Sequence, residues 1–310
     1  MSWNDDRISV LFACNENYVQ HAAACIASLT VNNPGVKFDI LVASTQDMPR
    51  GVARLEKTFS AVANIRLRTR TCPIPKDIKL PLPYHLTPET YLRFWIGELF
   101  PNQSRALYLD PDVVALRPID ELWNTDLDGR TVAAVPIPNS SRPAELGMPK
   151  GSPFFNAGVM LFDLDAWRAR SYQRRCLDFL AENQEKALDG DQGILNLCLF
   201  DDWKVLPHHW NVISMFYYTY HDLKLSAEEV ANIQRNAAIV HFNGASKPWS
   251  YFSNHPRKDE YWKYLKMTSS RSSSPPTSLS PSLRPPASSA SARASWSRPS
   301  SCSWTRRRPA

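Results

Sequence analysis

Two aspartates separated by a proline follow an apolar run in the stretch RALYLDPDVVAL (105–116). In extended backbone, residues i and i+2 point to one side, so Asp110 and Asp112 present their carboxylates together if this geometry persists through Pro111. Two carboxylates about 6 Å apart repel by about 3 kcal/mol at an effective dielectric of about 20. The pair therefore predicts a neighbouring cation, and a hard divalent ion such as Mn²⁺ or Mg²⁺ accepts carboxylate oxygens. The alternative is a solvated turn whose aspartates cap the next segment.

Two further polar stretches interrupt the apolar pattern, ACNENY (13–18) and IVHFNGASKPW (239–249). His241 is a candidate nitrogen ligand, although a lone histidine is more often a hydrogen-bonded core residue. Lys247 follows six residues later, where a cation could meet a diphosphate, and Gly244 permits a close backbone approach to that anion. In an open α/β sheet, ligands gather at the carboxyl ends of the strands. We therefore expect these stretches to meet Asp110 and Asp112 at one sheet edge.

The elements that would position these residues alternate between strands and helices, which predicts an α/β fold with much parallel pairing. Pro111 lacks the N–H of a central strand, so the strand before it should end there. Helical spacing of apolar residues predicts a helix over 17–33, Thr87 and Pro88 predict the start of a helix through Glu98, and DGDQGILN predicts another helix start. The Pro- and Gly-rich segment 136–154 predicts a long loop that acts as a lid. The strands are expected at 8–14, 38–44, 65–69, 106–110, 131–135 and 237–242.

Composition separates the chain into residues 1–267, which we expect to form one folded domain, and residues 268–310, which we expect to be disordered. The second segment contains seven arginines and no Asp, Glu or Lys. Its charge of +7 exceeds the net charge of the whole chain, which is +6, so residues 1–267 carry a net charge of −1. The folded part therefore offers no case for a nucleic-acid partner. The Ser/Pro/Arg-rich tail resembles a GC-rich gene read out of frame, and the alternative is a native disordered segment or an electrostatic tether to anionic lipid.

The six cysteines show no C-x-x-C pair, so reduced thiols are expected rather than a zinc or redox motif. The first residues lack the pattern of a signal peptide, and no apolar run approaches the roughly 20 residues of a membrane span. We therefore expect a cytoplasmic protein or one that is peripheral to the inner face of the membrane.

Four motifs in order give the chain a resemblance to glycosyltransferase family 8. They are LYLDPDVV (107–114), FFNAGVMLFDLDAWR (154–168), DGDQGILN (189–196) and HFNGASKPW (241–249). This family comprises retaining enzymes with the GT-A fold, and it includes bacterial lipooligosaccharide and lipopolysaccharide α-galactosyl- and α-glucosyltransferases. The resemblance covers residues from about 8 to about 265 and implies transfer of a hexose from a UDP-sugar to a saccharide or glycolipid acceptor.

The resemblance also implies roles for individual positions. Asp110, Asp112 and His241 would hold Mn²⁺ against the diphosphate. Asp191 and Gln192 would lie at the reacting face of the sugar as catalytic residues. The residues that would contact the donor or the acceptor are Ala13, Asn15, Asn17 and Tyr18 on the nucleoside, Arg93 and Asn156 on the sugar, Gly244 and Lys247 on the phosphates, and His85 on the acceptor.

Several of these residues have a structural alternative. Arg93 could pair with Glu89 one turn earlier, Asn156 could bond only to backbone, and Asp191 could cap the helix that begins near Gln192. The chain also departs from the family pattern, with Asn15 where close relatives carry an aspartate, Gly193 where some carry an acidic residue, and Ile137 where relatives often carry an aspartate. A metal-dependent nucleotidyltransferase would need a glycine-rich loop, and ACNENY has no glycine. A catalytically silent sugar-nucleotide-binding protein is the other alternative.

Overall fold

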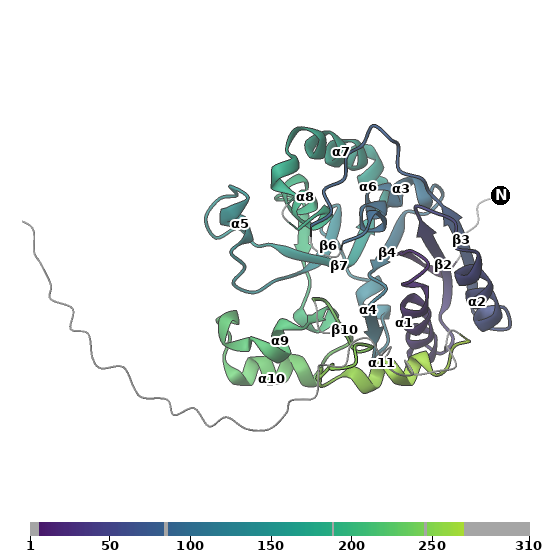
Figure 1. The fold of residues 1–310 in the computed structure, drawn as a ribbon. Coiled ribbons are helices and arrows are strands. Elements are labelled where there is room, and N and C mark those ends of the chain that lie inside the picture. Colours follow the sequence, from purple (N-terminus) through teal and green to yellow (C-terminus); the bar gives the residue numbers. More distant parts are fainter. Residues whose placement is uncertain (1–5, 84–85, 188, 245–246, 270–310) are drawn as a thin grey trace, which may run out of the picture. The chain divides into compact units, whose positions relative to one another are not determined.

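A mixed sheet of seven strands forms the centre of the fold in the residues that the computed structural model describes, which are 6–83, 86–187, 189–244 and 247–269 (Figure 1). The strands are ordered β3-β2-β1-β4-β7-β6-β8. Pairing is parallel except where β7 runs antiparallel to β4 and β6, so the expected α/β class is confirmed. Their bounds are β1 (Arg7–Ala13), β2 (Lys37–Ser44), β3 (Ile65–Thr71), β4 (Arg105–Leu109), β6 (Val132–Pro136), β7 (Phe155–Asp163) and β8 (Trp203–Val205).

A second, three-stranded sheet has the order β5-β10-β9 and was not predicted from the sequence. The strand expected at 237–242 contains β10, whereas β5 and β9 have three and two residues, too few for a periodic pattern to show. They are β5 (Val113–Ala115), β9 (Val212–Ile213) and β10 (Ile239–His241). Because β5 begins one residue after Asp112, the D-P-D turn lies between the two sheets.

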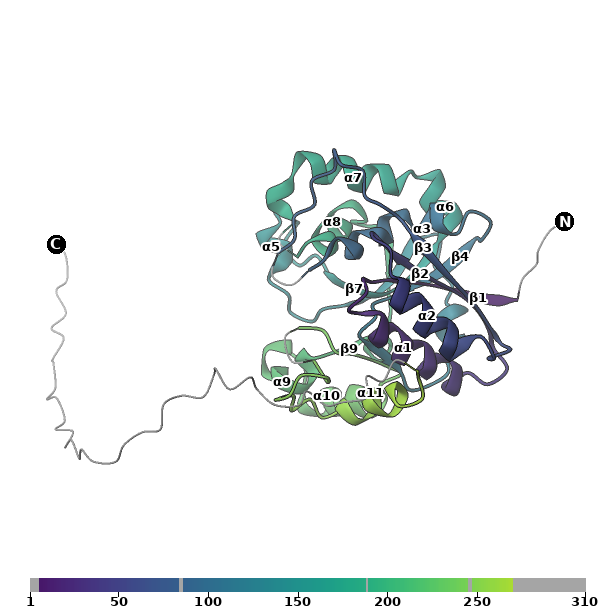
Figure 2. The same cartoon turned by 45° about the vertical axis from the view of Figure 1, so that its right-hand side comes forward.

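Helices cover both faces of the central sheet, and Figures 1 and 2 show α1 and α11 on one side and α6, α7 and α8 on the other. Val10 and Phe12 of β1 belong to the core under α1, whereas Leu11 and Ala13 belong to the core under α6 to α8. The strands are therefore apolar on both faces and read as continuous hydrophobic runs.

The helices are α1 (Val19–Asn32), α2 (Pro49–Phe59), η1 (Pro88–Trp95), α3 (Ile96–Leu99), α4 (Asp120–Trp123), α5 (Arg142–Glu145), α6 (Leu164–Ala169), α7 (Tyr172–Glu182), η2 (Gln184–Lys186), α8 (Asp191–Cys198), η3 (His208–Trp210), α9 (Met215–Tyr218), η4 (Tyr220–Leu223), α10 (Ala227–Arg235) and α11 (Lys258–Leu265).

The helix expected after Thr87 is present but differs in two respects. Its first eight residues form the 3₁₀ helix η1, and the Thr87 side chain makes no capping hydrogen bond. Glu89 does not pair with Arg93, as the alternative had it, because its carboxylate accepts from the hydroxyl of Thr45. Arg93 instead pairs with the half-buried carboxylate of Asp110 and the buried carboxylate of Asp191, which belong to the site described below.

The loop at 136–154 is more ordered than the sequence predicts. It contains the short helix α5, and Leu146, Met148 and Phe154 form a small buried cluster of their own. Arg142 of α5 makes a bidentate ion pair with Asp189, with both N–O distances at 2.7 Å. The loop is thereby tied to the segment that precedes α8, and its role as a lid stays a prediction.

Within the described part of the chain, no helix combines the length and the apolar character needed to cross a bilayer. The predictions for the tail concern residues 268–310, of which all but the first two lie outside the described residues. The proposed division at residue 267 therefore stays a prediction.

Two buried histidines predict that the fold loses stability in mild acid. Burial lowers the pKa of His21 to about 3 and the pKa of His255 to about 4, with the nearby Arg257 adding to the shift at His255. In the unfolded chain both rings have a pKa of about 6.5, so below that pH the unfolded state binds two protons that the native state does not. The free energy of unfolding should therefore fall by roughly 2 to 3 kcal/mol per pH unit near pH 5 from these two groups.

Urea denaturation at several values between pH 5 and pH 7 measures this slope. A variant that carries both His21→Gln and His255→Gln should show a shallower pH dependence, even though it is less stable at pH 7. An unchanged slope in that variant would contradict the assignment of the acid sensitivity to these rings.

Candidate active site

Strand pairing in the small sheet brings His241 to the D-P-D turn. β10 runs antiparallel to β5 with His241 opposite Val113, and the Phe242 N–H donates to the Asp112 carbonyl at 2.9 Å. On the other side, the Asp110 N–H donates to the Gly158 carbonyl at 2.8 Å and extends the β4–β7 ladder. Two sheets thus converge on Asp110 and Asp112 from opposite directions.

Asp110, Asp112 and His241 form a candidate metal site, as the sequence predicts. His241 Nε2 lies 3.2 Å from Asp112 Oδ1 and 3.5 Å from Asp110 Oδ2, and one ligand atom from each residue lies within 4.8 Å of the others. Ligands about 2.1 Å from one octahedral ion lie about 3 to 4 Å apart, so these donors match a hard divalent cation in type and spacing. Among the described residues this is the one cluster of three such donors.

Gly158 makes this close approach sterically feasible. A Cβ atom added to Gly158 would lie 2.2 Å from His241 Cε1 and 2.7 Å from Asp110 Oδ2. The glycine therefore leaves room for a ring and a carboxylate that meet over the strand β7. Within the motif FNAGV, sequence analysis singled out only Asn156, although a glycine inside an apolar strand is a known sign of a close approach.

Two cations offset the charge of the paired aspartates. Lys247 Nζ binds the Asp112 carboxylate and also donates to the Phe242 carbonyl at 2.8 Å. Burial alone would raise the pKa of Asp112. Lys247 and His241 outweigh this effect and hold the pKa of Asp112 well below its usual range. Arg93 Nη2 donates to Asp110 Oδ1 at 3.0 Å. The predicted neighbouring cations are thus partly supplied by the protein itself.

Arg93 also connects Asp110 to Asp191, which is buried at the start of α8. Arg93 Nε lies 2.9 Å from Asp191 Oδ2, and the guanidinium lies 4.1 Å above the ring of Tyr108. Burial raises the pKa of Asp191 to about 6, because Arg93 only partly offsets the burial and the charge of Asp110 adds to it. The alternative role of Asp191 as the N-cap of α8 is wrong. Gly190 occupies the N-cap position, and Asp191 is the first residue of the helix.

The ion pairs of Arg93 predict a large loss of stability in an Arg93→Met variant. Removal of the guanidinium leaves the Asp110 and Asp191 carboxylates without their shared partner, and breaking a buried pair in this way costs about 3 to 5 kcal/mol. Chemical denaturation measures the change. Arg174→Met, which removes an exposed pair with Asp178, is the control and should have little effect. Equal stability of the two variants would contradict the role of Arg93.

Hydrogen bonds fix the amide orientation of Gln192. Its Oε1 accepts from Asn156 Nδ2 and from the Ala157 N–H, both at 3.0 Å. Asn156 is held in turn by the Gly158 N–H, which donates to Asn156 Oδ1 at 3.0 Å. A backbone N–H can only donate, so both acceptor atoms must be oxygens. Within the described parts of the chain Gln192 Nε2 makes no hydrogen bond, so this group is left for a ligand.

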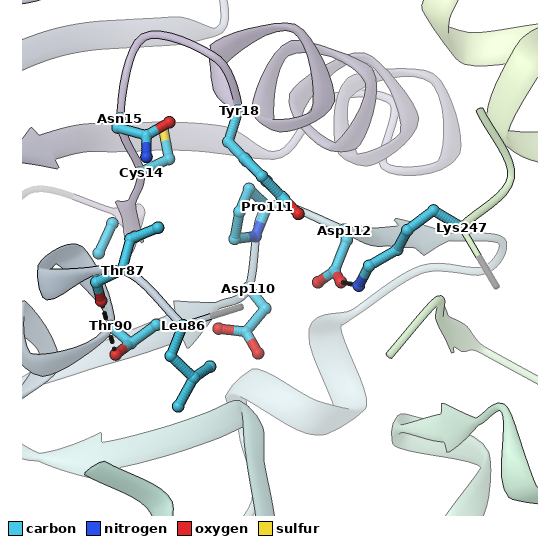
Figure 3. Close-up of a pocket in the computed structure, with 11 residues that line it drawn as sticks. Cys14, Asn15, Tyr18, Leu86, Thr87, Thr90, Asp110, Pro111, Asp112 and Lys247 are labelled. Atoms are coloured by element: carbon cyan, nitrogen blue, oxygen red, sulfur yellow. Dashed lines mark hydrogen bonds and ion pairs between the residues drawn. The ribbon is translucent and has the colours of Figure 1, made fainter. Parts of the chain in front are cut away.

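Two adjoining cavities meet at the aspartates. The first, called the β1 cavity, is lined by Ala13, Cys14, Asn15, Tyr18, Leu86, Thr87, Thr90, Asp110, Pro111, Asp112 and Lys247 (Figure 3). The second, called the α8 cavity, is lined by Leu86, Thr90, Arg93, Asp110, Asp112, Asn156, Ala157, Asp189, Asp191, Gln192, His241, Asn243, Gly244 and Lys247. Asp110, Asp112 and Lys247 belong to both, so they lie where the cavities join.

The predicted nucleoside-contacting residues divide between cavity and surface. Figure 3 shows Tyr18 beside Pro111 with its hydroxyl toward Asp112, and its ring packs edge-on against Trp249 with centroids 6.0 Å apart. Asn15 Oδ1 accepts from the Asn17 N–H at 3.1 Å. Asn17 itself is exposed and lines neither cavity, so its side chain is not brought to the site.

The remaining predicted residues are placed as follows. Gly244 lines the α8 cavity with φ of +80°, a left-handed conformation that favours glycine. His85 lies outside the described residues. Ile137 is half-buried against the apolar cluster of the 136–154 loop and lines neither cavity.

Asn211 is a site residue that the sequence analysis missed. It is fully buried, and its side chain contacts both Asn156 and His241. A single asparagine in the stretch HHWNVIS carries no motif or spacing that could have identified it.

Comparison with known proteins identifies a matching family model and related chains. The model described as glycosyl transferase family 8 matches residues 9–253. General stress protein A of Bacillus subtilis is 29% identical over 280 residues, which cover 85% of this chain and 95% of that protein. Glycosyltransferase GlyB of Streptococcus pneumoniae is 29% identical over 262 residues, which cover 83% of this chain and 61% of GlyB.

Solved structures show a similar fold. The galactosyltransferase LgtC, in complex with donor and acceptor sugar analogues, matches 86% of this chain and 98% of its own with a TM-score of 0.74 at 21% identity. The glycosyltransferase GlyE of Streptococcus pneumoniae matches 84% of this chain and 60% of its own with a TM-score of 0.64 at 22% identity. At these identities, the likeness establishes the fold alone.

Proposed function

The chain belongs to glycosyl transferase family 8 and has the GT-A fold, and on that premise we propose that it transfers galactose or glucose from a UDP-sugar to an acceptor hydroxyl. The transfer retains the anomeric configuration and depends on Mn²⁺, with Mg²⁺ as a second candidate. The acceptor is a saccharide or a glycolipid of the lipopolysaccharide type. A glycolipid acceptor would bring the protein to the cytoplasmic face of the membrane.

The junction of the two cavities at Asp110, Asp112 and Lys247 is the observation that carries this proposal. A sugar nucleotide has a base at one end, a hexose at the other and a diphosphate between them. The β1 cavity would take the nucleoside, and the α8 cavity would take the hexose. The diphosphate would then lie at the junction, where carboxylates suited to a cation and the ammonium of Lys247 meet.

Asp110, Asp112 and His241 would hold the cation. When bound, it supplies Lewis-acid stabilisation of the charge that develops on the leaving diphosphate. Lys247 would share its positive charge between Asp112 and the phosphate oxygens. Gly244, with no side chain, leaves room for those oxygens to approach the backbone.

The orientation of Gln192 favours attack from the same face of the sugar as the leaving group. Its Oε1 already accepts two hydrogen bonds, so Gln192 offers the substrate an N–H donor and no free electron pair for a covalent intermediate. In the proposed step, the bond from the anomeric carbon to the phosphate oxygen breaks and the bond to the acceptor oxygen forms on the same face. The acceptor proton passes to the departing phosphate oxygen. Asp191, paired with Arg93, accepts hydrogen bonds from the sugar hydroxyls.

Gln192→Ala should lower turnover by about 10² to 10³-fold, which is the usual cost of losing one donor aimed at developing charge. Binding of UDP should change little, because Gln192 lines only the α8 cavity. Initial rates and UDP calorimetry on the same preparation separate the two quantities. An unchanged rate would remove Gln192 from the reaction.

The direct test of the function is UDP release from a panel of UDP-sugars by the full chain, with Mn²⁺ and with EDTA. We expect release from UDP-galactose or UDP-glucose that EDTA abolishes and that an acceptor saccharide accelerates. Release that is equal in EDTA would contradict the role of the metal. Binding of UDP and Mn²⁺ without release from any donor, with or without acceptors, would favour a protein that has lost its chemistry.

A further inference from the structure

We propose that Asn211 is a positioning residue that fixes which nitrogen of His241 carries the ring hydrogen, so that Nε2 is left free to bind the cation. The inference rests on the metal site of the proposed function and deepens it. Asn211 lies between η3 and β9, is fully buried, and lines neither cavity. Its effect must therefore pass through its neighbours rather than through contact with substrate.

The orientation of Asn156 is the first step. The Gly158 N–H donates to Asn156 Oδ1 at 3.0 Å, and a backbone N–H cannot accept a hydrogen bond. On its other side, Asn156 Nδ2 donates to Gln192 Oε1, which the Ala157 N–H identifies independently as an oxygen. Backbone groups at both ends thus determine which atom of Asn156 is the oxygen.

The orientation of Asn211 follows from that of Asn156. Asn211 Nδ2 lies 2.8 Å from Asn156 Oδ1, and an amide oxygen can only accept, so the facing atom of Asn211 must be its nitrogen. Asn211 Oδ1 is then the atom that lies 3.0 Å from His241 Nδ1. The reverse orientation would place the oxygens of Asn211 and Asn156 against each other.

The hydrogen on His241 is the last step. Nδ1 lies 3.0 Å from Asn211 Oδ1 and 3.1 Å from Asn156 Oδ1, and both atoms are acceptors. Nδ1 must therefore carry a hydrogen, so Nε2 is the ring nitrogen that can give up its hydrogen and bind the cation. Nε2 is the nitrogen that faces Asp112 and Asp110. A histidine ligand binds a metal through its unprotonated nitrogen while the other N–H is held by an acceptor, and the two amide oxygens at Nδ1 lie where they can be that acceptor.

The pairing of β9 with β10 holds Asn211 in this place. His241 lies opposite Ile213 in a parallel register, and Asn211 immediately precedes β9. The side-chain contact is thereby set by backbone that is itself hydrogen-bonded. This geometry favours a ring whose orientation is fixed before the cation arrives.

The test compares Asn211→Leu and Asn211→Asp in the full chain, with Mn²⁺ alone as the probe. Leucine removes both hydrogen bonds, and loss of an outer partner of a metal ligand typically weakens metal affinity by about 10 to 100-fold. Aspartate keeps the acceptor for His241 Nδ1 but turns its second oxygen toward Asn156 Oδ1, so its Mn²⁺ affinity should lie between that of Asn211→Leu and that of the wild type. Calorimetry, or electron paramagnetic resonance of free Mn²⁺, measures the affinity without any sugar nucleotide.

Asn33→Leu is the matched control. Asn33 is also buried and also makes two hydrogen bonds, to the Leu29 carbonyl and from the Ile119 N–H, both at 2.8 Å. This variant should lose stability to a similar degree and keep its Mn²⁺ affinity. Equal Mn²⁺ affinities of Asn211→Leu, Asn33→Leu and the wild type would overturn the proposal.

Nitrogen-15 spectra of the histidine rings give a readout that a purely structural role would not move. In the metal-free wild type, Nδ1 of His241 should carry a hydrogen, because both of its neighbours are amide oxygens. An Nδ1 without a hydrogen would overturn the proposal even if Asn211→Leu does not fold. If the wild type fails to bind Mn²⁺ at all, the metal site of the proposed function fails and this role falls with it. If the wild type binds Mn²⁺ and Asn211→Leu binds it with the same affinity, only the role of Asn211 is refuted.

Discussion

An Asp112→Asn variant should turn over a UDP-sugar about 10³-fold more slowly than the wild type, the upper end of the usual cost of removing one electrostatic group from an active site. Asp112 Oδ1 lies 3.2 Å from His241 Nε2, and its other oxygen binds Lys247. The substitution keeps the shape of the side chain but removes the charge that would hold the cation. Mn²⁺ affinity and UDP release, measured on the same preparation, should fall together.

Asp39→Asn is the matched control for this substitution. Asp39 is buried in β2, accepts from Arg68 at 3.0 Å and 2.8 Å, and lines neither cavity. Its loss should lower the stability of the fold without weakening Mn²⁺ binding. If the two variants had the same Mn²⁺ affinity and the same rate, Asp112 would have no part in binding the cation.

A Gly158→Ala variant should lose most of its Mn²⁺ affinity and most of its activity, although the substitution adds a single methyl group. That methyl would lie 2.2 Å from His241 Cε1 and 2.7 Å from Asp110 Oδ2, so the ring and the carboxylate cannot both keep their places. Overpacking of this kind also costs about 1 to 3 kcal/mol of stability. The expected signature is therefore a loss of metal binding that exceeds what the loss of stability explains.

Gly97→Ala separates these two effects. A Cβ atom at Gly97 would lie 2.9 Å from Trp167 Cδ1, a clash that involves no residue of the candidate site. This variant should be destabilised and should bind Mn²⁺ as the wild type does. Thermal unfolding and Mn²⁺ titration of both variants provide the comparison. Wild-type Mn²⁺ affinity in Gly158→Ala would show that the site can expand and would contradict the steric argument.

The strands β1 to β4 and β6 and the helix α1 could be predicted from the sequence because their signals are local, whereas β7, α2 and α7 were not among the expected elements. The continuous apolar runs of β1 and β2 reflect burial on both faces, and the spacing of apolar residues in α1 reflects burial on one face. The same local logic placed a strand end at Pro111. Of the small sheet, only β10 lies in an expected strand, and β5 and β9 have three and two residues and leave no such signal, so the sheet itself was not anticipated.

The sequence by itself determined which groups could do chemistry in this protein. The two aspartates around Pro111 and the histidine in IVHFNGASKPW were recognisable from their types and positions, and the resemblance to the family pointed to Asp191 and Gln192. These features can be seen in the sequence because each lies within a few residues of the end of a strand or the start of a helix. The motif order also carried the resemblance to the family.

Only the tertiary structure decided how these groups are held. The pairing of Arg93 with Asp110 and Asp191, the room made by Gly158, and the chain of amides from Gln192 through Asn156 to Asn211 and His241 all join residues far apart in the sequence. Their contacts depend on the registers of β4 with β7 and of β10 with β5 and β9. A shift of one residue in any strand turns a side chain to the other face, so these contacts exist only once the sheets have formed.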